Sequence, residues 1–143
     1  MMVRYLMVLL LMCGGCAATA PEAAAPAVPA ATVTGSVSYR ERIALPPDAR
    51  VIVRLVDVSK ADAPATVLGE QVIATQGLQV PFAYAITYDP RRIDPRFTYA
   101  VQARIELGDG SLRFISDTHH PVLTRGAGSS VDLVLVAAGG AAR

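Results

Sequence analysis

Two cysteines near the start of the chain have the spacing of a redox-active pair. Cys13 and Cys16 enclose Gly14 and Gly15 in a C-x-x-C sequence. Such pairs work in thiol–disulfide chemistry because a folded helix N-terminus lowers the pKa of one thiol. No βαβ pattern surrounds this pair, and an apolar run comes directly before it. The sequence therefore disfavours redox chemistry, and the preceding segment indicates a different role for the cysteines.

That preceding segment has the parts of a secretory signal peptide. Arg4 supplies a positive charge, residues 5–12 form an uninterrupted apolar run, and small residues follow. A membrane-spanning helix is the alternative, but even residues 5–20 provide only 16 positions, whereas a span needs about 20. We therefore predict a signal peptide over residues 1–15.

The small residues before Cys16 resemble the signal of bacterial lipoproteins, in which a cysteine is acylated on its sulfur and becomes the new N-terminus. Gly14 and Gly15 match that signal, whereas Cys13 stands where the motif usually has Leu. The resemblance implies cleavage between Gly15 and Cys16 and lipid on Cys16. The chain would then be anchored to the membrane through that lipid. Ala17 follows in place of the Asp that marks inner-membrane retention, which implies the outer membrane, facing the periplasm.

An alanine- and proline-rich stretch follows the cysteine. Residues 17–31 contain nine Ala and three Pro, and the prolines interrupt any helix that the alanines would favour. With no bulky side chains to bury, residues 16–31 are predicted to be a disordered tether. We expect the folded domain over residues 32–137 and a disordered tail over 138–143.

Ser116, Asp117 and His119 supply the residue types of a hydrolase triad. Successive strand residues point to opposite faces, so these side chains do not converge without a sharp bend, and we predict no catalytic residue, no cofactor and no enzyme. His119 and His120 offer two imidazoles, but a structural zinc site uses four ligands. An exposed turn is the favoured interpretation, with a weak zinc or copper site as the alternative.

Arg91, Arg92 and Arg96 form a cationic stretch between two Asp-Pro turns. Asp89 and Asp94 offset part of this charge, so a solvated loop is the favoured interpretation. The alternative is a partner-binding loop, because guanidinium groups bind carboxylates and phosphates through two parallel hydrogen bonds.

The elements that position these side chains are predicted to be strands. Apolar residues alternate with polar ones, turn signals separate the runs, and no segment has helical periodicity. Asp109-Gly110 is the strongest hairpin turn, and Tyr99 lies where a tyrosine-corner residue would. We expect an all-β fold, an antiparallel β-sandwich of immunoglobulin-like or transthyretin-like architecture. Its seven strands are 33–39, 51–58, 67–74, 80–88, 98–107, 112–116 and 131–135.

Composition restricts the function further. The 143 residues are 52% hydrophobic and carry 13 basic against 12 acidic side chains, a formal net charge of +1. Nucleic-acid binding needs a clustered cationic face, so this balance argues against nucleic acid as a partner.

Several motifs resemble the YbaY/YscW family of bacterial lipoproteins. They are Val-Thr-Gly-Ser-Val-Ser-Tyr-Arg-Glu-Arg at 33–42, Leu-Pro-Pro-Asp-Ala at 45–49, Val-Pro-Phe at 80–82, Tyr-Asp-Pro at 88–90 and Ile-Asp-Pro-Arg at 93–96. The resemblance implies a β-sandwich lipoprotein without catalytic residues. One branch of that family acts as a pilotin, a chaperone that helps an outer-membrane secretin reach its place.

Two classes of function therefore stay open at this point. The favoured one is a non-enzymatic, pilotin-like envelope lipoprotein that binds or chaperones another envelope protein through loops or a strand edge. The alternative is a module that binds a small ligand or lipid and senses envelope stress, which requires a concave apolar pocket.

Overall fold

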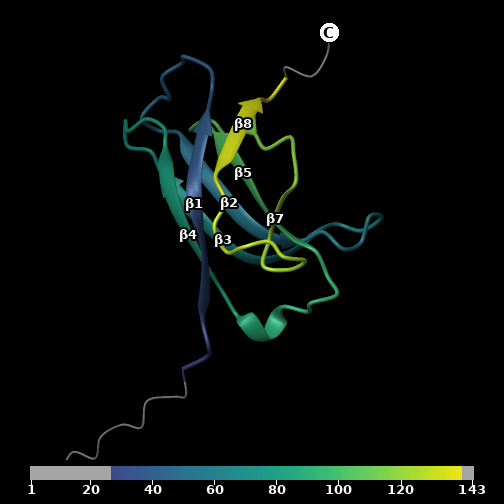
Figure 1. Ribbon diagram of the computed structural model, residues 1–143. Coiled ribbons are helices and arrows are strands. Elements are labelled where there is room, and N and C mark those ends of the chain that lie inside the picture. Colours follow the sequence, from purple (N-terminus) through teal and green to yellow (C-terminus); the bar gives the residue numbers. More distant parts are fainter. Residues whose placement is uncertain (1–26, 140–143) are drawn as a thin grey trace, which may run out of the picture.

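The computed structural model describes residues 27–139, and its regular elements are eight strands and one short 3-10 helix (Figure 1). The predicted signal peptide and most of the predicted tether, with Cys13, Gly15 and Cys16, lie outside the described residues. The elements are β1 (Ala31–Tyr39), β2 (Arg50–Asp57), β3 (Thr66–Ala74), β4 (Phe82–Tyr88), η1 (Pro90–Arg92), β5 (Tyr99–Glu106), β6 (Leu112–Ile115), β7 (His120–Val122) and β8 (Leu133–Ala137).

The strands form one continuous sheet that curls into a nearly closed barrel. Its hydrogen-bonded order is β3-β2-β5-β6-β8-β1-β4, and β7 pairs with β5 beside β6. The all-β class is thus confirmed. The predicted pair of antiparallel sheets is not what the chain builds, since β8 pairs with β6 on one flank and with β1 on the other.

The pairing of β1 with β8 is parallel, with Val37 opposite Leu133 and Tyr39 opposite Leu135. This corrects the expectation of a purely antiparallel sheet. The other pairings between the named strands are antiparallel. The one parallel pairing thus brings the first and last strands of the described chain together.

The two outer strands of the sheet, β3 and β4, close the barrel by a side-chain seam. The Gln71 side-chain oxygen accepts a hydrogen bond from the Ala85 backbone N–H at 2.7 Å, as a strand carbonyl would. Gly69 permits the approach, because a Cβ there would lie 2.6 Å from Ile86 Cγ2 and 2.7 Å from the Thr87 carbonyl oxygen. The strand edges thus protect each other from other chains.

The interior is filled by the residues whose alternation predicted the strands. Phe82, Tyr84 and Ile86 of β4 are buried, and Tyr39 stacks on Phe114 with ring centroids 4.2 Å apart. The remaining large, fully buried side chains of this core are Tyr99, Leu55, Ile105, Leu133, Leu135, Val33, Val37, Val51 and Val53. At roughly 25 cal/mol per Å² of buried apolar surface, this core is the main stabilising term of the fold.

Strand β7 was not predicted, and it corrects the expectation of an exposed turn at the two histidines. His120 is half-buried and pairs with Val101 of β5, although His119 is exposed. The strand has three residues and includes Pro121, so it shows no alternation and lacks one backbone donor. Its pairing with the long strand β5 is what makes it a strand.

The loops gather at the two ends of the barrel. The described chain enters at one end, which we call the entry end, and β1 leads to the opposite or far end (Figure 1). Strand directions place three connections at the entry end, namely 58–65, 89–98 and 123–130. They place three others at the far end, namely 40–49, 75–81 and 107–111.

Candidate functional site

Strand β8 is poorly paired along both flanks. Its first three residues pair only with β1, and its last two, Val136 and Ala137, pair only with β6. Strand β7, which continues past β6, pairs with β5 alone. Within residues 27–139, the middle of β8 therefore has unpaired backbone beside it, and such an edge is a ready site for another chain.

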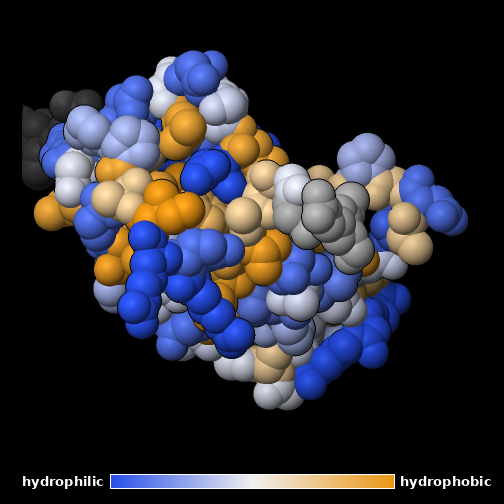
Figure 2. Space-filling model, turned by 90° about the horizontal axis from the view of Figure 1, so that it is seen from above, coloured by the Kyte–Doolittle hydropathy of each residue, from blue (hydrophilic) through white to orange (hydrophobic). Residues whose placement is uncertain are grey.

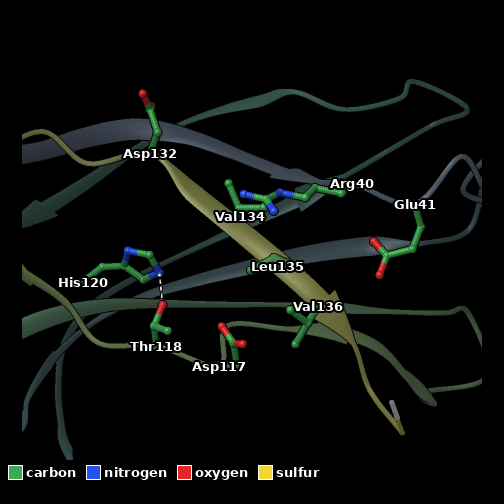
Figure 3. Close-up of a pocket in the computed structure, with 9 residues that line it drawn as sticks. All are labelled: Arg40, Glu41, Asp117, Thr118, His120, Asp132, Val134, Leu135 and Val136. Atoms are coloured by element: carbon green, nitrogen blue, oxygen red, sulfur yellow. Dashed lines mark hydrogen bonds between the residues drawn. The ribbon is translucent and has the colours of Figure 1, made fainter. Parts of the chain in front are cut away.

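A groove of about 330 Å³ follows this strand (Figure 3). Arg40 and Glu41 lie on one side of β8, and Asp117, Thr118 and His120 lie on the other. We call this the β8 groove; its remaining lining residues are Asp132, Val134, Leu135 and Val136. An adjoining hollow of about 420 Å³ shares Glu41, Asp117 and Val136 and extends to Ile115.

The β8 groove has apolar side chains on the outer face of its strand. Leu133 and Leu135 point into the core, so Val134 and Val136 point outward and are 39% and 37% exposed. Ile115, opposite Val136 in β6, is 38% exposed. Viewed onto the far end, the surface shows apolar side chains between polar ones (Figure 2). A segment of another chain could bury these three apolar side chains.

The charged side chains of the β8 groove are mainly acidic. Asp132 is already engaged, because one carboxylate oxygen accepts hydrogen bonds from the Ser36 N–H and hydroxyl at 3.0 and 2.9 Å. Glu41 is not satisfied in this way. Its Oε2 is buried without a hydrogen-bond partner among the described residues. Burial and, next, the charge of Glu41 raise the pKa of Tyr39. A basic group of a ligand bound in the groove would offset the charge of this partly buried carboxylate.

The segment that leads into β8 is held by a contact that passes over β1. The Tyr84 hydroxyl of β4 donates a hydrogen bond to the Val131 carbonyl at 2.6 Å. Gly35 of β1 admits this carbonyl, because a Cβ there would lie 1.8 Å from the oxygen. Burial and the nearby charge of Asp132 raise the pKa of Tyr84 to about 12, so its hydroxyl keeps the proton that it donates.

The candidate triad does not assemble. The Ser116 hydroxyl oxygen accepts a hydrogen bond from the Ala103 N–H at 3.2 Å and so continues the pairing of β5. Asp117 lines the β8 groove, whereas His119 lines a different hollow, with Ser59 and neighbouring residues of β5 and β7. The three side chains belong to three separate environments, so they do not form a triad.

The two histidines also diverge. His119 and His120 lie in different hollows, and the Thr118 hydroxyl lies 3.1 Å from Nε2 of the His120 ring. Over residues 27–139, no three His, Cys, Asp or Glu side chains come together in a group that could hold a metal.

Arg91, Arg92 and Arg96 lie in the connection 89–98, which we call the arginine loop. Arg91 and Arg96 each form a two-pronged ion pair with the aspartate two residues earlier, at 2.8 Å for Asp89 and 2.7 Å for Asp94. These contacts lower the pKa of both carboxyl groups, that of Asp94 to about 2. Two of the three arginines are therefore already bound within the loop.

Tyr99 fastens the same loop to the barrel, in agreement with its resemblance to a tyrosine-corner residue. Its hydroxyl accepts a hydrogen bond from the Asp94 N–H at 2.9 Å and lies 3.4 Å from the Arg92 carbonyl. The ring itself is 1% exposed. The loop is thus tied to the core at its centre.

Sequence reasoning did not identify the β8 groove. Glu41 and Asp117 are separated by most of the chain and meet only because β8 lies between their segments. One local signal was present, since Val134 is an apolar residue at an outward position of a predicted strand. Exposed valines are common in strands. Val134 indicates a groove only because the strand that carries it is poorly paired.

The described residues thus form a small filled β-barrel with a groove beside a poorly paired strand. The model of the family described as "Type III secretion system lipoprotein chaperone (YscW)" matches residues 28–135. The chain belongs to this family, which confirms the resemblance found in the motifs.

Two relatives support this assignment. The chain is 40% identical over 111 residues to "Uncharacterized lipoprotein YbaY" of Escherichia coli (strain K12), covering 78% of this chain and 57% of that protein. The chain thus spans a little over half the length of this relative. It is 50% identical to "an alternative pilotin from the type II secretion system of Vibrio cholerae", with a TM-score of 0.74 over 78% of this chain and all of the other.

Across residues 27–139 there is no helix of the length and apolar character that crossing a membrane requires.

Proposed function

We propose that this chain is a lipid-anchored lipoprotein of the cell envelope that binds a segment of another envelope protein in the β8 groove, as a pilotin-like, non-enzymatic chaperone. Membership in a family of lipoprotein chaperones supports the class of function, and so does the 50% identity to a pilotin. The observation that carries the proposal is the groove itself, where exposed valines lie beside a carboxylate without a partner.

The groove predicts the chemistry of the bound segment. Apolar side chains of the partner would cover Val134, Val136 and Ile115, and a basic side chain would reach Glu41 and Asp117. Interfaces gain most of their affinity from a few desolvated anchors within a polar rim. The proposed partner is therefore a segment in which apolar and basic residues share one side, and a pilotin-like role implies an outer-membrane secretin as its source.

The proposed anchor is lipid on Cys16 after cleavage behind Gly15, which would hold the domain at the outer membrane, facing the periplasm. More than one acyl chain makes such anchoring stable. Mass spectrometry of the N-terminus of the exported protein tests this directly. A mature chain that begins with acylated Cys16 is expected, whereas an unmodified N-terminus at another residue would overturn it.

The alternative of a small-ligand or lipid-binding module is less well supported. Ligand pockets bury most of the ligand's surface in a concave apolar cavity. The interior of this barrel is occupied by its own aromatic and aliphatic side chains, and the β8 groove is open at the surface (Figure 3). A long, shallow site suits a polypeptide better than a small molecule.

Crosslinking in the cell tests the partner. A photoreactive residue replaces Val134 in one strain and Val72, an outward valine of β3 that is 51% exposed, in another. We expect a specific crosslinked envelope protein from position 134 and not from position 72. The same products from both positions, or none from position 134, would contradict a partner in the groove.

A further inference from the structure

The chain enters the barrel next to the arginine loop. Ala31 pairs with Tyr88, the last residue before that loop. Val28 and Arg92 line the same surface hollow, of about 290 Å³. In Figure 1 the start of β1 and η1 lie at the same end of the molecule. A membrane attachment before residue 27 would therefore join the domain at the end that carries the arginine loop.

Charge differs between the two ends of the barrel. The entry-end connections 58–65, 89–98 and 123–130 carry five basic side chains (Lys60, Arg91, Arg92, Arg96 and Arg125) and three acidic ones (Asp62, Asp89 and Asp94). The far-end connections 40–49, 75–81 and 107–111 carry two basic side chains (Arg40 and Arg42) and three acidic ones (Glu41, Asp48 and Asp109). The positive end is thus the one at which the chain enters.

The excess charge at the entry end is available at the surface. Arg92 is exposed and has no ion pair or side-chain hydrogen bond with another described residue. Arg125 donates to the Thr98 hydroxyl and to the Arg96 carbonyl, both at 3.1 Å, which holds loop 123–130 against the arginine loop. Phe97, between these contacts, is 38% exposed. Cationic groups and an exposed aromatic ring thus share one end.

We propose that this end docks on the anionic phospholipid headgroups of the membrane in which the chain is anchored, and the proposal rests on the proposed acylation of Cys16. Arginine binds phosphate well, and each basic side chain near an anionic leaflet contributes a favourable interaction. Fourteen residues separate Cys16 from Ala31, so even at the full extension of about 3.5 Å per residue a lipid on Cys16 would keep the entry end within roughly 50 Å of the membrane.

Docking at the entry end turns the far end, and with it the C-terminal half of β8, away from the bilayer. The partner-binding groove and the lipid-binding loop then occupy different surfaces of one small domain. A protein partner for the arginine loop is the competing interpretation. Two of its three arginines already form ion pairs with Asp89 and Asp94. The remaining positive charge suits the anionic surface of a bilayer. A specific carboxylate motif of a protein would instead need several guanidinium groups that are free to bind it.

The test uses the full acylated chain on vesicles of phosphatidylcholine, with or without phosphatidylglycerol, at low ionic strength. Flotation first establishes that the chain is anchored to both vesicles. Hydrogen exchange is then followed in residues 89–98 and, as an internal reference, in 40–49. We expect slower exchange in 89–98 only on the anionic vesicles, and loss of that protection in high salt, because screening shortens the reach of surface charge.

Charge reversal gives the matched comparison. Arg92→Glu should lower the ratio of docked to undocked chain about 25-fold, at about fivefold for each unit of charge. Arg42→Glu, an exposed arginine at the far end, should leave the ratio unchanged. Stable folding of both variants is checked by thermal unfolding in solution.

The outcomes separate the two proposals. Flotation with equal exchange on both vesicles overturns headgroup docking and leaves the anchor intact. A chain that does not float overturns the anchor and docking with it. Unchanged exchange in Arg92→Glu, combined with weaker recovery of an envelope protein, assigns the loop to a protein partner instead.

Discussion

The Tyr84 hydroxyl and the Val131 carbonyl oxygen lie 2.6 Å apart, and this contact places the last strand of the chain against the first. It crosses over Gly35, where no side chain could fit beneath the carbonyl. Behind it, Val131 N–H donates to the Thr34 carbonyl at 3.0 Å. The segment that leads into β8 is thus held from both β1 and β4.

Removing the Tyr84 hydroxyl should weaken this attachment. Tyr84→Phe keeps the ring in the core but leaves the Val131 carbonyl without its side-chain donor, so we expect a loss of about 1–3 kcal/mol in the free energy of unfolding. Chemical denaturation measures this loss. Tyr88→Phe is the control, since Tyr88 is half-buried and makes no side-chain hydrogen bond among the described residues. Equal stability of the two variants would contradict a role for the contact.

The same tyrosine predicts an alkaline limit. Its pKa rises from 10.0 to about 12 on folding, so the neutral form is favoured in the folded state. The stabilisation is fully present below pH 10 and is lost as the pH rises toward 12, because the unfolded chain gives up the proton first. Unfolding followed between pH 9 and pH 12 should show a shallower decline in Tyr84→Phe than in the unaltered chain. Parallel curves would contradict this assignment.

The seam between β3 and β4 predicts a sensitive glycine. Gly69→Ala places a methyl group within 2.7 Å of the Thr87 carbonyl, and backbone must move to relieve it. Overpacking of this kind costs about 1–3 kcal/mol. Gly128→Ala is the matched control, since its nearest neighbour would lie at 4.0 Å. The expected outcome is a lower melting temperature for Gly69→Ala alone, and a stable Gly69→Ala would show that the seam is not closely packed.

Asp94 should resist protonation unless Arg96 is changed. Hydrogen bonds from the Arg96 side chain and N–H lower the pKa of Asp94 to about 2. The contribution of this pair to stability is present above pH 3.8 and is lost as the pH falls toward 2. An NMR titration of the carboxyl carbon measures the pKa. Arg96→Gln should raise it toward the ordinary value, and an identical titration in both chains would contradict the ion pair.

Glu41 is expected to favour binding at the expense of stability. Its Oε2 is buried without a hydrogen-bond partner within residues 27–139, and removing the charge lowers the cost of that burial. Glu41→Gln should therefore raise the melting temperature slightly while weakening a basic partner segment about tenfold, the effect of ~1.4 kcal/mol. Calorimetry of Glu41→Gln measures both its melting temperature and its affinity for the partner segment. Reduced stability with unchanged affinity would show that Glu41 is structural.

The strands with clear alternation were predictable from sequence, because in a half-buried strand the buried side chains recur at every second position. Strand β5 is buried at Tyr99, Val101, Ala103 and Ile105 as expected. The Asp109-Gly110 turn is also confirmed, since Gly110 has φ 84° and the Leu107 N–H donates to the Ser111 carbonyl at 2.9 Å.

The groove and the barrel closure were not predictable in this way. The pairing of Val37 with Leu133 joins residues almost a hundred positions apart, and no local pattern states that it is parallel. A glycine weakens an isolated strand, and the reason for Gly69 and Gly35 is visible only in the atoms that lie against them in the folded chain. The β8 groove exists because β1 and β6 each pair with only part of β8. The extent of that pairing depends on how strands far apart in the sequence align.

The parallel pairing of β1 with β8 also determines how the domain transmits force. A pull on the entering chain acts on β1, and a partner bound along β8 pulls against it. The two strands would slide along each other, so the hydrogen bonds between 37–39 and 133–135 would be strained together rather than opened one after another. This geometry would suit a domain that has the anchor and the partner proposed above, because load between them would fall on all of these hydrogen bonds at once.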